Sequence, residues 1–165
     1  MKDIPQERAR IRNTLMYTVT PSFQAGVEYN PLKDEAGPLA NWRVVAERGW
    51  RPALILGTSS DRIGTPHGQS FYATVSKNLK PETGLPVAPY AGVSYGTFED
   101  ELDPIGGGSI FWTDRISTTH LYDGKNVHHI LNLGVTDRLT VGILYVTQKH
   151  DAGDPYWGLT WGFRF

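Results

Sequence analysis

The chain of 165 residues contains no cysteine, which excludes a disulfide framework and a thiolate metal site. Its charges nearly cancel, with 16 Lys and Arg against 17 Asp and Glu, so the charge balance does not indicate nucleic acid or another strongly charged partner. No apolar run approaches the roughly 20 residues that a membrane-spanning helix needs. The length fits one domain with a substantial core.

Helical periodicity is also nearly absent. Residues 5–13 are the only helix candidate, and they are few and mostly charged, so we expect residues 1–13 to be a flexible or weakly helical leader. The rest alternates with period two in nine runs, near residues 18–30, 41–48, 52–59, 69–78, 87–98, 108–116, 127–136, 138–148 and 156–165. Clusters of turn-forming residues separate these runs. The pattern predicts an all-β protein in which residues 14–165 form one antiparallel barrel or sandwich domain.

The sequence is rich in glycine and aromatic residues, with 18 Gly, 5 Trp, 8 Tyr and 6 Phe. In most runs one face is apolar and the other is small or polar; Val27 and Tyr29, for example, alternate with Gly26 and Glu28. Glycine weakens a strand that faces water, but it fits where side chains converge inside a narrow barrel. The pattern therefore favours an apolar face that points outward into lipid. The runs at 52–59 and 108–116 do not separate into an apolar and a polar face. A soluble barrel or sandwich is the alternative fold.

Charged residues on the polar face predict an interior charge network formed by Glu28, Arg43 and Glu47. A charge inside a barrel must be paired and hydrogen-bonded, and two acids flanking one arginine have the composition for this. On a soluble fold the same residues would be solvated surface charges. With large side chains such as Tyr72 and Leu144 beside the network, we expect a mostly filled interior with no wide pore.

Two features bear on catalysis. The segment "GVSYG" at residues 92–96 matches a nucleophile elbow, but no helix follows it, as the elbow requires. His120, His128 and His129 cluster around one predicted loop, where a histidine and a carboxylate can orient a base or bind a metal. Because the adjacent residues His128 and His129 point to opposite faces of a strand, they do not readily contribute to one site. We expect these to be loop or interface histidines, with no catalytic residue, no cofactor and no metal.

The end of the chain, "YWGLTWGFRF", places a large apolar side chain at every second position. It resembles the C-terminal signature of bacterial outer-membrane β-barrels, which commonly end on Phe with aromatic or apolar residues at alternate positions before it. The resemblance implies that Trp161, Phe163 and Phe165 form a signal read by the barrel-assembly machinery. Thr160 departs from the pattern, because glycine is often found at this distance from the end.

A longer stretch, residues 42–79 with the upstream "FQAGVEYNP", resembles barrel segments of the YjbH-like outer-membrane proteins of Gram-negative bacteria. The resemblance is carried by Arg43, Glu47, Pro52, Ala53, Gly57, Asp61, Gly64, Thr65, Ser76 and Lys77. Those proteins are associated with exopolysaccharide production and are much longer. The resemblance implies an outer-membrane location, and it implies that this chain is a small relative or a single barrel unit.

These observations together predict an antiparallel up-and-down transmembrane β-barrel of eight to ten strands. Ten strands result if residues 14–30 hold two strands around Pro21, and eight result if one ambiguous run lies outside the barrel. We expect a small bacterial outer-membrane protein with a structural, anchoring or exopolysaccharide-related role. Its expected partners are the lipid bilayer, the barrel-assembly machinery and polysaccharide or lipopolysaccharide, with no nucleic acid.

Two alternatives belong to other classes. A soluble β-barrel that binds a small apolar ligand requires apolar side chains facing inward. An outer-membrane lipid-modifying hydrolase requires that Ser94 or a loop serine lie within hydrogen-bond reach of His120, His128 or His129.

Overall fold

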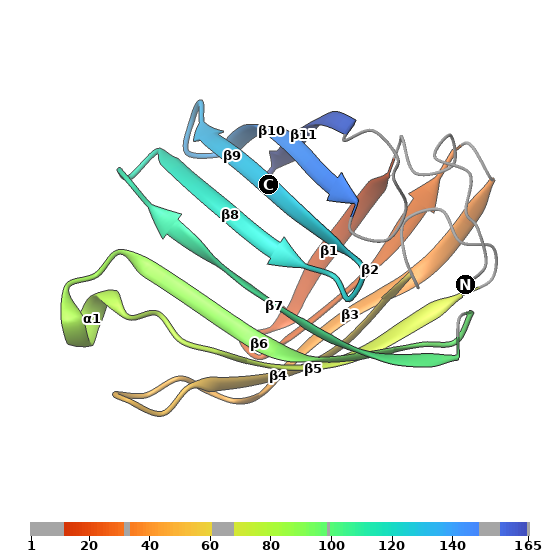
Figure 1. The fold of residues 1–165 in the computed structure, drawn as a ribbon, viewed down its shortest axis with the longest axis horizontal. Helices are drawn as coiled ribbons and strands as arrows, with labels where there is room; N and C mark the ends of the chain where they lie inside the picture. Colours follow the sequence, from red (N-terminus) through yellow and green to blue (C-terminus); the bar gives the residue numbers. More distant parts are fainter. Residues whose placement is uncertain (1–11, 32–33, 61–67, 99, 149–155, 165) are drawn as a thin grey trace. The chain divides into compact units, whose positions relative to one another are not determined.

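The computed structural model describes residues 12–31, 34–60, 68–98, 100–148 and 156–164, and most of them lie in β-strands (Figure 1). The strands are β1 (Asn13–Thr20), β2 (Phe23–Asn30), β3 (Glu35–Val45), β4 (Ala53–Ser60), β5 (Gln69–Ser76), β6 (Val87–Gly96), β7 (Glu101–Phe111), β8 (Ile116–Tyr122), β9 (Asn126–Gly134), β10 (Leu139–Gln148) and β11 (Tyr156–Phe163). A short helix, α1 (Lys80–Thr83), lies between β5 and β6. The predicted leader falls outside the described residues except for Arg12 and Asn13, and Asn13 already begins β1.

The strands form one antiparallel sheet in chain order from β1 to β11, which confirms the all-β antiparallel prediction. Within the described residues β1 is not paired with β11, so the sheet is not closed into the predicted barrel. The predicted number of eight to ten strands was also too low. Bacterial single-chain barrels have an even number of strands, and the eleven strands of this sheet do not match that number.

Three segments account for the difference in strand number and boundaries. Residues 13–30 form two strands, β1 and β2, as the ten-strand prediction assumed. Residues 116–122 form β8, although their polar Ser-Thr-Thr-His sequence was assigned to a loop. β7 begins at Glu101 and passes through Pro104 and three glycines, where turn chemistry had been predicted. In β7 and β8 pairing with a neighbouring strand outweighs the weak local β-propensity.

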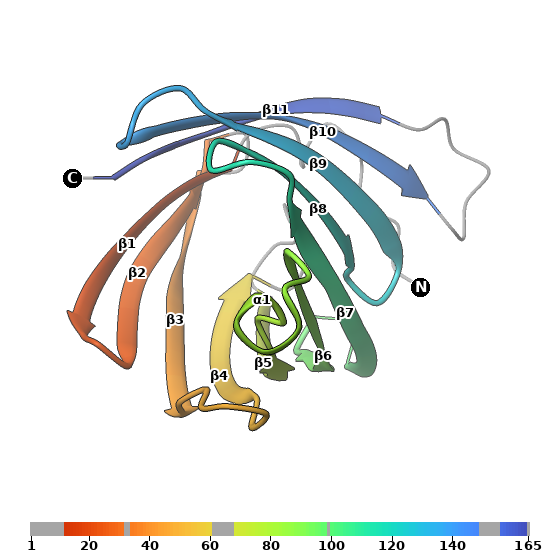
Figure 2. The same cartoon turned by 90° about the vertical axis from the view of Figure 1, so that its left-hand side faces the viewer.

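The contacts between residues divide the chain into two compact units, Met1–Val75 with Gly92–Asp103 and Ser76–Ala91 with Pro104–Phe165. In the first unit β2 pairs with β1 on one side and with β3 on the other (Figure 1). In this register Val27 lies opposite Leu15 and Pro38. In the second unit β8 to β11 follow one another as antiparallel neighbours (Figure 2). The site residues discussed below are positioned by these two sets of ladders.

Burial follows the predicted alternation, with the polar face as the covered one. In β2, Glu28 and Asn30 are buried while Val27 and Tyr29 are exposed. Among the described residues 27 large hydrophobic side chains are exposed, whereas the buried hydrophobic ones are Leu39, Ala53 and Val146. Water-soluble domains show the opposite distribution, with large apolar side chains most often inside. Apolar surface is therefore the main feature that the fold presents to its surroundings.

Candidate functional site

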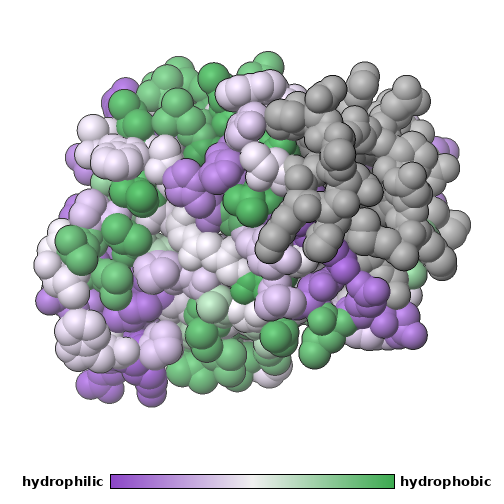
Figure 3. Space-filling model, in the orientation of Figure 1, coloured by the Kyte–Doolittle hydropathy of each residue, from purple (hydrophilic) through white to green (hydrophobic). Residues whose placement is uncertain are grey.

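The exposed apolar surface of the second unit is built from cross-strand rows. At the centre of the ladders, Leu131 of β9, Ile143 of β10 and Leu159 of β11 lie opposite one another. The next row on the same face holds Leu133, Val141 and Trp161 in the same order of strands. Figure 3 shows hydrophobic side chains gathered over β8 to β10 on the face in view. The surface is contiguous across three strands, which distinguishes it from scattered exposed leucines.

All five tryptophans of the chain are exposed, by between 51% and 74%. Trp50 lies between β3 and β4, and Trp112 directly follows β7. Trp42, Trp157 and Trp161 lie within three residues of a strand end. Tryptophan is usually highly buried in soluble domains, and it is enriched at the boundary between lipid and water. All five tryptophans therefore lie near or beyond the ends of strands, where aromatic residues are found in proteins that meet a membrane interface.

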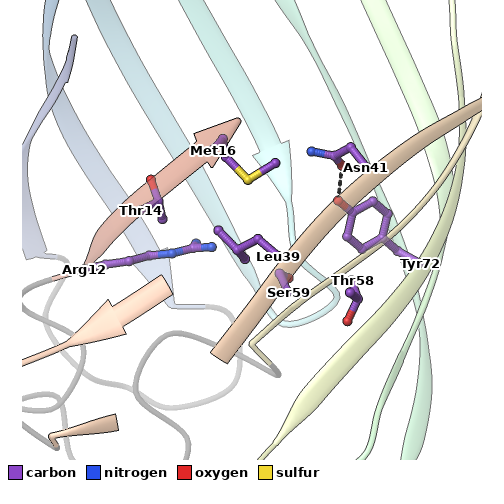
Figure 4. A pocket seen from close by; sticks show the side chains of 8 residues that line it. All are labelled: Arg12, Thr14, Met16, Leu39, Asn41, Thr58, Ser59 and Tyr72. Carbon is purple, nitrogen blue, oxygen red and sulfur yellow. Dashed lines mark hydrogen bonds between the residues drawn. The ribbon is translucent and has the colours of Figure 1, made fainter. Parts of the chain in front are cut away.

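The polar face of the first unit contains a pocket with a cavity volume of about 290 Å³ (Figure 4). Its lining is mostly hydrogen-bonding side chains: Arg12, Thr14, Met16, Leu39, Asn41, Thr58, Ser59 and Tyr72. The view shows Asn41 and Tyr72 pointing toward each other, while Arg12 extends toward Leu39. Hydroxyl, amide and guanidinium groups in one pocket suit a polar, uncharged or anionic ligand better than an apolar one.

Glu28 is the most deeply placed charge on this face, with 4% of its surface exposed. Its Oε1 accepts a hydrogen bond of 2.6 Å from the Ser60 hydroxyl, and its Oε2 lies 2.6 Å from the Arg12 guanidinium. The geometry at Oε2 is that of an ion pair and not of a hydrogen bond. Arg12 thus supplies the compensating charge that a buried carboxylate requires.

Two residues of the predicted network of Glu28, Arg43 and Glu47 lie at opposite ends of the β2–β3 ladder. Glu28 lies opposite Gly37, whereas Arg43 follows Trp42 at the other end of the same ladder. The Arg43 guanidinium donates a 2.8 Å hydrogen bond to the carbonyl oxygen of Pro21. Glu47 lies beyond the end of β3.

The sequence reasoning missed Arg12 because it assigned that residue to the leader. Continuing the alternation of residues 14–20 back by two positions would have placed Arg12 on the polar face beside Glu28. The position of Arg12 near the start of the chain was therefore not a sufficient reason to place it in the leader.

Tyr72, Gly57 and Asn41 form a second cluster in the pocket wall. Asn41 of β3 lies opposite Gly57 of β4, and the Tyr72 hydroxyl donates a hydrogen bond to the Asn41 side-chain oxygen. A Cβ atom added at Gly57 would come within 3.0 Å of the Tyr72 ring and the Ala40 carbonyl oxygen. The tyrosine therefore crosses β4 over a position that only glycine leaves open.

His128 and Asp123 form a pair at the β8–β9 turn of the second unit. His128 Nε2 lies 2.7 Å from Asp123 Oδ2, and Asp123 Oδ1 accepts hydrogen bonds from the backbone N–H groups of Lys125 and Asn126. Burial acts to raise the pKa of Asp123, but the hydrogen bonds from His128, Asn126 and Lys125 outweigh it and leave the pKa lowered. The pair holds the turn, which has the positive-φ Gly124 at its tip.

His120 and His129 form a separate pair on the other face of β8 and β9. The two residues lie directly opposite each other, and their Nδ1 atoms are 2.7 Å apart. His128, next in sequence, points away to the turn, as predicted from strand alternation. His67 and His150 lie outside the described residues.

The hydrolase alternative finds no support in the hydrogen bonds of its candidate residues. The "GVSYG" segment lies within the continuous strand β6, and the hydroxyl of Ser94 pairs with that of Ser70. The partners of the histidines are Asp123 for His128 and each other for His120 and His129. A serine nucleophile beside a histidine base is the arrangement that this chemistry needs.

Trp161 and Phe163 of the predicted C-terminal signal lie on the exposed face of β11, and Phe165 lies outside the described residues. The described helix is too short to cross a membrane. In the same residues no group of three or more histidine, aspartate or glutamate side chains is arranged to hold a metal ion.

Comparisons with protein-family models, curated protein sequences and solved structures give no match for this chain.

Proposed function

We propose that the chain is a bacterial outer-membrane protein whose strands span the bilayer, with the apolar face against lipid. The observation that carries this proposal is the exposure of all five tryptophans together with the apolar rows, while Glu28, Thr74 and His128 are buried. Each Å² of apolar surface left in water costs about 25 cal/mol. A hydrocarbon environment removes this cost, and it also explains why the polar side chains face away from the exposed surface.

Strand lengths and the positions of aromatic residues also support the proposal. Five strands, β3, β6, β7, β9 and β10, have 9 to 11 residues, as a tilted strand that crosses a bilayer needs, and the other six have 7 or 8. Trp157 and Phe163 lie near opposite ends of β11, with Leu159 between them. Aromatic girdles around an aliphatic band are typical of outer-membrane barrels.

The bilayer places one further requirement on the sheet. Unpaired backbone groups are not tolerated in hydrocarbon, so the edges of β1 and β11 must gain partners there. The proposal therefore includes a transmembrane barrel closed by pairing of these edges or by an added strand. Trp161, Phe163 and Phe165 are proposed as the segment that the barrel-assembly machinery recognises.

Within this class we propose a structural, anchoring or exopolysaccharide-related role. The resemblance of residues 42–79 to barrel segments of YjbH-like proteins supports it. The polar pocket supports it as well, since Arg12, Asn41 and Tyr72 offer hydrogen bonds to the hydroxyls of a polysaccharide or lipopolysaccharide. A soluble barrel with an apolar ligand inside is disfavoured by the burial pattern, which places polar side chains on the covered face.

The test compares folding with and without a membrane mimic. The chain is refolded into detergent micelles, and its gel mobility is compared before and after boiling. We expect a mobility shift on boiling, detergent-dependent solubility, and quenching of tryptophan fluorescence by lipids brominated along their acyl chains. A monomer that is soluble without detergent and shows no shift and no quenching would overturn the proposal.

A further inference from the structure

We infer that His120 and His129 form a binding site for a divalent transition-metal ion, with Cu²⁺ as the preferred ion. The two residues are opposite each other on adjacent strands, and their Nδ1 atoms face one another at 2.7 Å. This inference rests on the side-chain geometry. The pair lies on the face of the sheet that is proposed to contact lipid, in the row of Tyr145 and Trp157 near the start of β11.

The geometry needs little adjustment to admit a metal. Imidazole nitrogens bind such ions at about 2.0–2.1 Å, so two nitrogens on one ion lie roughly 3 Å apart. The observed separation is slightly shorter, and small side-chain rotations are enough to open it. The two rings are inclined at 66° with centroids 5.0 Å apart, so they do not block each other by stacking.

The surroundings hold the pair in place and leave room on one side. His129 stacks on Tyr145, and Tyr145 in turn contacts Trp157, with ring centroids 4.7 Å apart. Both histidines line a pocket with a cavity volume of about 260 Å³. That space can hold the water molecules or the exogenous ligand that complete the coordination shell of a metal bound by two protein nitrogens.

Ligand chemistry determines the class of ion. Neutral imidazole suits copper, zinc and nickel, and among divalent ions of the first row Cu²⁺ binds such sites most tightly. Oxygen-preferring ions such as Mg²⁺ and Ca²⁺ are not expected, because no carboxylate is among the residues that line this pocket.

The experiment titrates the folded full-length chain with CuCl₂ and compares wild type with His120→Gln, His129→Gln and His128→Gln. Affinity is measured by calorimetry, and the nitrogen ligands are counted from the hyperfine structure of the Cu²⁺ electron paramagnetic resonance spectrum. His128→Gln is the matched control, because His128 is the sequence neighbour of His129 but pairs with Asp123.

We expect wild type and His128→Gln to bind one Cu²⁺ through two equivalent nitrogens. Each of the other two variants should lose at least tenfold in affinity and the two-nitrogen signal. Circular dichroism spectra that match wild type establish that the variants fold. Retention of the affinity and signal in His120→Gln or His129→Gln, or an equal loss in His128→Gln, overturns the inference.

Discussion

Tyr72 of β5 donates a hydrogen bond to the side-chain oxygen of Asn41 of β3, although the whole of β4 lies between these two strands. The contact is possible because Gly57 of β4, opposite Asn41, has no side chain in its path. Glycine weakens a strand by itself, but here it allows an aromatic ring to cover the backbone and to link strands that are not neighbours. The cluster therefore ties three strands of the polar face together.

Substitution of Gly57 tests this arrangement. In Gly57→Ala the new Cβ would come within 3.0 Å of the Tyr72 ring and the Ala40 carbonyl oxygen, so the ring must move and the Asn41 hydrogen bond breaks. We expect a loss of about 1–3 kcal/mol in the free energy of unfolding, measured with denaturant in detergent micelles. Gly162→Ala is the control, since an added Cβ there meets nothing within 4 Å. Equal effects in the two variants would show that Tyr72 does not depend on Gly57.

The ion pair of Glu28 and Arg12 gives a second prediction. Removing Arg12 leaves a carboxylate that is 4% exposed without its compensating charge, so Arg12→Gln should destabilise the fold, by an amount that exceeds that of an exposed pair. In the double variant Arg12→Gln with Glu28→Gln the carboxylate is gone, and part of the stability should return.

A double-mutant cycle measures this coupling. We expect a coupling energy of about 1–3 kcal/mol between the two positions from equilibrium unfolding. Arg43→Gln combined with Glu28→Gln is the control, because the ladder register places those residues at opposite ends of β2 and β3. Strong coupling of Glu28 to Arg43 with none to Arg12 would contradict the assigned ion pair and support the network that was predicted from the sequence.

The β8–β9 turn should make stability depend on pH through Asp123. Burial acts to raise the pKa of this carboxyl, but hydrogen bonds from His128 and two backbone N–H groups outweigh it, so the pKa is lowered. A group whose folded pKa lies below its unfolded value of about 3.9 contributes stability above that pH, and the contribution is lost as the pH falls through the folded pKa. Asp123→Asn should therefore cost about 1–3 kcal/mol at pH 6 and much less near pH 3.

Unfolding curves of wild type and Asp123→Asn at pH 6, 4.5 and 3 check this dependence. Asp137→Asn, in the exposed turn between β9 and β10, removes the same charge without these hydrogen bonds and should have little effect at any of the three values. A cost for Asp123→Asn that stays constant from pH 6 to pH 3 would contradict the assignment.

The strand faces were predictable from the sequence because side-chain direction alternates strictly along a strand. Val27 and Glu28, for example, lie on opposite faces in the structure as the pattern indicates, and the C-terminal alternation from Trp157 to Phe163 is exposed throughout. The number of strands was harder to predict from the sequence than the strand faces. β8 has polar residues on both faces, and β7 contains Pro104 and three glycines, which are typical of turns. The local composition of these segments therefore did not indicate strands, which form because they pair with their neighbours.

The pairs at the candidate sites were not predicted, because they depend on register. Recognition of residues 116–122 as a strand would have paired His120 with His129 across the Asp123-Gly124 turn. The partner of Glu28 was missed for a similar reason: Arg12 lies just before a strand whose beginning was not located. Charge composition alone pointed to Arg43, which is on the same face but near the other end of the ladder.

The proposed lipid contact gives the sharpest prediction, because the expected effect of one substitution on the free energy of unfolding differs between water and a bilayer. Leu159 is 85% exposed at the centre of β11, opposite Ile143 of β10. For a strand in water, Leu159→Arg is a surface substitution with an effect within about 0.5 kcal/mol. For a strand in lipid, arginine near the bilayer midplane costs about 2–4 kcal/mol.

The variant is compared with Leu85→Arg, which places the same charge on an exposed leucine between α1 and β6. Both proteins are refolded into vesicles, and the free energy of unfolding is measured with denaturant by tryptophan fluorescence. We expect a loss of about 2–4 kcal/mol for Leu159→Arg and little change for Leu85→Arg, because the proposal places only Leu159 against hydrocarbon. If Leu159→Arg is neutral in vesicles, this face does not contact lipid, and the rows of Leu131, Ile143 and Leu159 must be covered by protein instead.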